Sequence, residues 1–210
     1  VEESGKNNIN QYDNSGNLVV NILRTLANTY PDQPHFAGHL ARYYFYSDQN
    51  FDLGFQVITE AIQNARTIER YSMGSLLHIK AMGYSARIQR QHLPTIRNAM
   101  DHARKTGEYR EDAILIAELV KKVRTDIILA TEIFDEAKQE TTSRFASNIA
   151  ECEMTLQILT VFDLLRTWCV ECSLDEIVTE KEQLEMHDRV DNLIEDSEHR
   201  LQGSKGESDY

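Results

Sequence analysis

Proline, glycine and cysteine are all scarce in this chain of 210 residues. It contains 3 Pro and 9 Gly, and long stretches contain neither of these two residues, which are the least favourable ones in a helix interior. Their scarcity favours a helical protein. The 3 Cys are too few for a disulfide scaffold, so we expect a reducing, intracellular setting.

Long apolar runs are also missing. None approaches the roughly 20 residues that a membrane-spanning helix needs, and the polar first residues, VEESGKNNIN, do not resemble a signal peptide. We therefore expect a cytoplasmic protein that has no membrane partner. The chain lacks an initiator Met, which predicts a segment of a longer protein or a processed one.

Basic charge is in short supply. Lys and Arg number 22 against 34 Asp and Glu, for a net charge of −12, so we expect no nucleic-acid binding through a basic face. Over residues 171–210 the imbalance is 13 acidic against 4 basic residues. A solvated helix face is the simpler interpretation of this acidity, and an acidic docking surface for a basic partner is the alternative.

Strand signals are absent, whereas helical spacing is frequent. No segment alternates apolar and polar residues, and no Asn-Gly or Asp-Gly hairpin turn occurs. Hydrophobic residues make up 41% of the chain, enough for a folded core. The sequence predicts an all-α fold of about seven or eight helices that stack as antiparallel pairs.

The clearest pair of helices covers residues 35–46 and 51–65, joined by a turn at residues 47–50 with Asp48 or Asn50 as the helix cap. The inward face of the second helix carries large and small residues at offsets of three, four and three, which share one stripe of a helix. These residues are Phe51, Gly54, Ile58 and Ala61. The same pattern recurs 76 residues later, at Ile127, Ala130, Phe134 and Ala137, and indicates a repeat.

Apolar periodicity also places the remaining helices. It predicts helices over residues 16–29, 72–90, 112–140, 144–170 and 174–201, and a shorter one within 91–107. Pro94 and Gly107 are expected to bound the short helix, Ser15 to cap the first, and Ser173 or Asp175 to cap the last. A turn is expected at residues 141–143. The predicted domains are a flexible lead-in (1–14), a helical domain (15–202) and a flexible tail (203–210).

Cys169 and Cys172 have the C-x-x-C spacing of a thioredoxin-type motif. That motif depends on a helix N-terminus to lower the thiol pKa, whereas this pair ends a helical pattern and has Glu171 between the thiols. Both features should raise the thiol pKa. Without a second pair the spacing is also weak for zinc. Ordinary core and surface thiols are the simplest interpretation, and a redox or metal role is a remote alternative.

No other grouping predicts chemistry. His35 and His39 have a metal-binding spacing, but no carboxylate or Cys stands at the next turn, so we interpret both as structural. No Ser, His and Asp grouping follows from spacing. We expect neither an enzyme nor a bound cofactor or metal.

An aromatic run, residues 43–46, follows Arg42 in the first helix of the pair. Core packing explains most of it. The alternative is a groove in which aromatic and arginine side chains hold a partner peptide. The candidate groove residues are Arg42, Tyr43, Tyr46, Arg87 and Arg90.

Two resemblances follow from these residues. Leu40, Ala41 and Tyr44, followed by the stripe from Phe51 to Ala61, resemble the tetratricopeptide repeat. The segments PHFAGHLARYYFYSDQNFDLGFQVITEAI, SLLHIKAMGYSARI, IFDEAKQE and NIAECEMTLQILTVF resemble the helical region of large STAND-type P-loop NTPases related to the sterile-alpha-motif-domain-containing protein 9 family. Ala37 departs from that wording, which usually has an aromatic residue there, and no G-x-x-x-x-G-K-[ST] motif is present.

The resemblance implies a tetratricopeptide-like α-α superhelix, an α-solenoid. It further implies a non-enzymatic, protein-binding regulatory module of a larger STAND NTPase in innate or antiviral defence. Its partner would be a protein, either a peptide segment or adjoining domains of its own parent chain. A free-standing scaffold or chaperone adaptor is the alternative, and a thiol or metal protein that uses Cys169 and Cys172 is the remote one.

Overall fold

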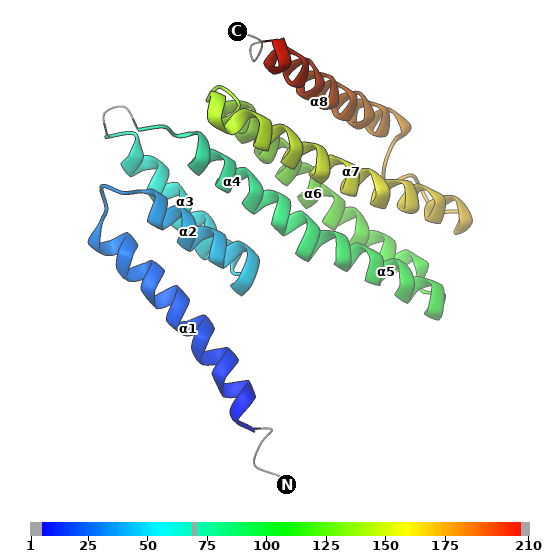
Figure 1. The fold of residues 1–210 in the computed structure, drawn as a ribbon. Helices are drawn as coiled ribbons and strands as arrows, with labels where there is room; N and C mark the ends of the chain where they lie inside the picture. Colours follow the sequence, from blue (N-terminus) through cyan, green and yellow to red (C-terminus); the bar gives the residue numbers. More distant parts are fainter. Residues whose placement is uncertain (1–5, 69–70, 207–210) are drawn as a thin grey trace.

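The fold is all-α. The computed structural model describes residues 6–68 and 71–206, and in these ranges eight α-helices and two π-helical turns form seven continuous helices without any strand (Figure 1). None of the helices in these ranges is both long and apolar enough to cross a membrane. The elements are α1 (Lys6–Thr29), α2 (His35–Tyr43), η1 (Tyr44–Asp48), α3 (Phe51–Ala65), α4 (Gly74–Arg87), η2 (Ile88–His92), α5 (Leu93–Thr106), α6 (Tyr109–Ala137), α7 (Thr141–Glu171) and α8 (Glu180–Gly206).

The helices follow one another across the molecule from α1 at one end to α8 at the other (Figure 1). The π-turn η1 continues α2, and η2 joins α4 to α5 without a break. The long rod α4–η2–α5 packs along α6 and α7, and α8 lies on α7. The main core lies where α4, α5, α6 and α7 meet, around fully buried residues such as Phe134, Phe162 and Trp168.

Phe45 fills a second core between α2, α3 and α4. Its fully buried ring lies directly against Gly54 and Gly83, so closely that a Cβ atom on either glycine would collide with it. The inward stripe from Phe51 to Ala61 is buried as predicted. In the second stripe Ala130, Phe134 and Ala137 are buried, whereas Ile127 is only half-buried.

Three predicted helix starts lie too late, one of them that of α6, which begins at Tyr109 instead of residue 112. The first helix begins at Lys6 instead of residue 16, and Ser15 lies inside it rather than capping it. Of the predicted lead-in, residues 1–5 lie outside the described residues, as do residues 207–210 of the predicted tail. The predicted turn at 141–143 belongs to α7. The chain reverses just before it, at residues 138–140, where the Glu140 N–H donates to the Ala137 carbonyl at 3.2 Å.

The last helix begins later than predicted, at Glu180, so neither Ser173 nor Asp175 caps it. Residues 172–179 form a loop in which Ser173 lies in the left-handed region, at φ 53°. Buried Val178 anchors this loop to the core. Thr179 caps the helix instead, because its Oγ1 accepts the Glu182 N–H at 3.2 Å, the first half of a Thr-x-x-Glu capping box.

Pro94 does not break the helix, contrary to the prediction. It lies in the first turn of α5, where its missing N–H is tolerated directly after the π-turn. In η2 the Leu93 N–H reaches back five residues to the Ile88 carbonyl instead of four. Gly107 does end α5, as predicted, at a left-handed φ of 79° that suits glycine.

Candidate functional site

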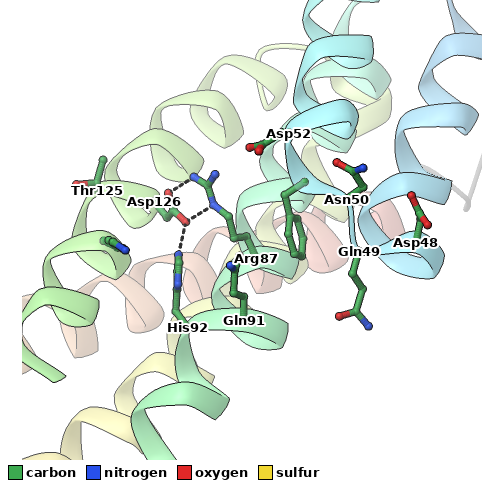
Figure 2. A pocket seen from close by; sticks show the side chains of 11 residues that line it. Asp48, Gln49, Asn50, Asp52, Arg87, Gln91, His92, Thr125 and Asp126 are labelled. Atoms are coloured by element: carbon green, nitrogen blue, oxygen red, sulfur yellow. Dashed lines mark hydrogen bonds and ion pairs between the residues drawn. The ribbon is translucent and has the colours of Figure 1, made fainter. Parts of the chain in front are cut away.

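The two π-turns lie on either side of one pocket. A pocket of about 670 Å³ opens between the end of η1, the end of η2 and the middle of α6 (Figure 2). Such turns contain one residue more than an α-helical turn and are frequent at functional sites. The lining residues are Asp48, Gln49, Asn50, Phe51, Asp52, Arg87, Gln91, His92, Lys122, Thr125 and Asp126. We call this the π-turn pocket.

Asp126 is the buried anion of the pocket, with 3% of its side chain exposed. Arg87 donates from Nε to Asp126 Oδ2 at 2.8 Å and from Nη2 to Oδ1. The Nε2 atom of His92 lies 3.3 Å from Oδ2, so both side chains point at one carboxylate from the same rod (Figure 2). Burial alone would raise the pKa of Asp126, but the hydrogen bonds from His92 and Arg87 outweigh burial and lower it.

Arg87 is also held from its other side. Its guanidinium carbon lies 4.9 Å from the centre of the Phe55 ring and 5.3 Å from that of Tyr84, which is within cation–π range. The two rings pack on each other with centroids 4.3 Å apart. Asp126 and the two rings therefore hold the side chain in place, so Arg87 links α3, α4 and α6. It also lines the pocket, and its groove role stays a prediction.

His92 leaves one buried atom without a partner. Its side chain is 8% exposed, and Nδ1 has no hydrogen-bond partner among the described residues. Around it the pocket presents the exposed side chains of Gln91, Lys122 and Thr125, and those of Gln49 and Asp52 across the opening. This mixture of amides, carboxylates and one ammonium group suits the polar groups of a peptide better than an apolar ligand.

Three of the five predicted groove residues come together next to this pocket. The Arg90 guanidinium lies 5.1 Å from the centre of the Tyr46 ring, and its Nη1 donates to the Tyr46 carbonyl at 2.7 Å. Burial raises the pKa of the Tyr46 hydroxyl, and the charges of Arg42 and Arg90 partly oppose that rise. Both arginines are exposed. We call Arg42, Tyr46 and Arg90 the Arg–Tyr cluster.

Tyr43 is not part of that cluster. It packs with Tyr44 and Leu40 in the small core toward α1, and the Tyr43 and Tyr44 rings meet edge to face at 6.2 Å. The interpretation of the aromatic run as core packing therefore holds for Tyr43, as it does for buried Tyr44 and Phe45.

The thiols do not form an activated pair. Cys169 is buried and Cys172 half-buried, and both are free. Burial raises the pKa of both thiols. Neighbouring carboxylates add to the rise, from Glu176 for Cys169 and from Glu171 for Cys172. Thiols with raised pKa values are poor nucleophiles at neutral pH.

The histidine pairs do not form a metal site or an accessible catalytic group. The His35 and His39 rings meet edge to face at 6.4 Å. Within residues 6–68 and 71–206 no group of three His, Cys, Asp or Glu side chains could hold a metal ion. The Nδ1 atom of His78 lies 3.1 Å from the Ser147 hydroxyl, but Ser147 is fully buried, out of reach of a substrate.

These features define a helical domain whose buried polar groups join helices to one another. Comparison of the chain with known protein families, with curated proteins and with solved structures finds no match, so no family is identified.

Proposed function

We propose that this chain is a non-enzymatic protein-interaction and regulatory module, a tetratricopeptide-like segment of a larger STAND-type P-loop NTPase in innate or antiviral defence. The observation that carries the proposal is the Arg–Tyr cluster. Arg90 is already ordered on Tyr46, so a partner does not have to pay its full ordering entropy. An aromatic residue flanked by two arginines is typical of protein-binding surfaces.

The sequence segments that resemble STAND-type NTPases support the NTPase part of the proposal. The first of these segments includes Arg42, Tyr46 and η1, and the second ends at Ile88, two residues before Arg90. In this proposal the partner is an acidic or aromatic segment, supplied by a second protein or by the parent chain. Its binding at the cluster biases the neighbouring NTPase between two states.

The first test is the intact reading frame around this chain. A G-x-x-x-x-G-K-[ST] motif in it is the expected result. Without that motif the NTPase part of the proposal fails, and a free-standing scaffold or adaptor becomes the better hypothesis.

The second test is regulation of the intact protein. Arg42→Ala with Arg90→Ala should change the basal ATPase rate, whereas Arg97→Ala with Lys105→Ala, which removes the same charge from exposed positions on α5, should not. Equal rates for all three proteins would remove the regulatory role of the cluster.

A further inference from the structure

An exposed apolar seam runs along α7. Phe145, Ile149, Cys152 and Leu156 follow one another at offsets of four, three and four, the spacing of a and d positions in a coiled coil. Phe145 is 46% exposed, Ile149 42% and Leu156 46%, and Cys152 is half-buried between them. We call these four residues the α7 seam. A stripe this narrow is what a single packed helix covers.

The helix α8 extends this seam on one side. Gln183 of α8 donates to Asp163 of α7 at 2.5 Å, and Asp163 continues the seam seven residues beyond Leu156. Ile194, 44% exposed, lies eleven residues after Gln183 and therefore on the same side of α8. Asp196 pairs with Arg144 at 3.0 Å, which places Ile194 at the level of Phe145.

The edge of α8 next to the seam is acidic. Asp191 and Glu198 lie three residues before and four residues after Ile194, so they share its side of the helix. Both are exposed, and so is Glu153 on the far flank of the seam. Lys181 is the one exposed Lys or Arg over residues 180–199, and it pairs with Glu185 at 3.5 Å.

We propose that the α7 seam and the adjacent edge of α8 bind a basic amphipathic helix. Its apolar face covers Phe145, Ile149, Leu156 and Ile194, and its Lys or Arg residues face Asp191 and Glu198. A second copy of this chain fits less well, because pairing two such surfaces would bring like charges together. This surface lies on other helices than the Arg–Tyr cluster, so it stands independently of the function proposed above.

The test is the binding of two probe peptides to the chain, measured by titration calorimetry. Both peptides have about three heptads with leucine at positions a and d. At the remaining positions one peptide carries lysine and the other glutamate. The lysine peptide should bind, more weakly as salt is added, and the glutamate peptide should not. Equal binding of the two peptides, or no binding of either, would overturn the proposal.

Substitutions in the chain test whether the lysine peptide binds at the α7 seam and the adjacent edge of α8. Ile149→Ser with Leu156→Ser should lower the affinity for the lysine peptide by about tenfold or more. Each buried aliphatic side chain contributes that order of affinity. The matched control is Ile114→Ser with Leu115→Ser, two exposed residues of α6. Asp191→Lys with Glu198→Lys should also weaken binding, and Glu111→Lys with Glu132→Lys should not.

The charge variants keep the test decisive if the seam variant does not fold, because Asp191 and Glu198 are exposed. Controls that weaken binding as much as the seam variants would indicate unspecific charge attraction and contradict the proposal. Sedimentation should give a monomer. If sedimentation instead gives a dimer that Ile149→Ser dissociates, the α7 seam binds a second copy of the chain and the proposal is wrong.

Discussion

Asp126 joins α6 to the α4–η2–α5 rod through buried polar contacts. Arg87 and His92 both reach it, and with 3% of its side chain exposed it has little access to water that could replace them. Removing one member of a buried ion pair leaves the other charge uncompensated. Asp126→Ala should therefore lower the free energy of unfolding by about 3 kcal/mol or more, measured by urea denaturation. Glu132→Ala, an exposed change on the same helix, should stay within about 0.5 kcal/mol of the parent protein.

The lowered pKa of Asp126 predicts a pH dependence. Because the folded-state pKa lies below the unfolded value of about 3.9, the carboxylate stabilises the fold above about pH 4. That stability is lost as the pH falls through the folded-state pKa. The stability difference between the protein and its Asp126→Asn variant should be constant above about pH 5 and shrink below about pH 4. A difference that stays constant down to about pH 2 would contradict the lowered pKa.

Arg87, His92 and Asp126 illustrate what the sequence does not predict. Arg87 and His92 are five positions apart, and on an α-helix this spacing turns the two side chains about 140° apart. The π-turn η2 adds a residue to the rod and directs both at one carboxylate. The sequence gives no clear signal for a π-turn, so it predicts no role for His92 or Asp126. Of the Arg–Tyr cluster, helical spacing predicts only that Arg42 and Tyr46 lie together, one turn apart. The contact of Arg90 with Tyr46 joins residues 44 positions apart.

At the scale of helices, Phe45 fixes the spacing of α2, α3 and α4. Its ring leaves no room for a Cβ at Gly83. Gly83→Ala should therefore destabilise the protein by about 1–3 kcal/mol, the usual cost of overpacking a core. Phe45→Leu should recover part of that loss in the double variant. Purely additive effects in this double-mutant cycle would show that the two residues do not interact.

Glu151 fixes the position of α8. It is fully buried on α7 and pairs with Lys138, which directly follows α6, at 2.5 Å and with Arg189 of α8 at 2.7 Å. Glu151→Ala should cost about 1–3 kcal/mol, because Lys138 and Arg189 lose their buried partner and keep only the exposed Asp135. Hydrogen exchange should show that amide protection falls most in α8, whose main packing neighbour is α7. Loss of protection spread evenly over all helices would argue against this role.

Helix identity is predictable here, and helix ends are less so. Long apolar stripes place α3, α6 and α7 close to their observed ranges, because burial of a continuous stripe dominates their stability. The helix boundary predicted at Pro94 is wrong, since a π-turn and a position in the first turn of α5 accommodate this proline. The start of α8 is missed because Leu174 and Ile177 have helical spacing but pack as loop residues against the core. The Thr179 cap, whose Oγ1 accepts the Glu182 N–H, marks the true start.

On the scale of the molecule, the buried and the exposed polar groups have different roles. Asp126 and Glu151 join helices, whereas the Arg–Tyr cluster and the α7 seam face solvent on different parts of the stack. In this account stability depends on the first set and partner binding on the second. Substitutions in the two sets should therefore affect different properties of the protein.

The measurement that tests this account most directly compares two variants of the intact protein in thermal denaturation and in basal ATPase rate. Arg42→Ala with Arg90→Ala should change the ATPase rate and leave the melting temperature within about 2 °C of the parent. Asp126→Asn should lower the melting temperature, and below that temperature the ATPase rate should stay at the parental value. A change of ATPase rate in Asp126→Asn but not in the arginine variant would contradict the account.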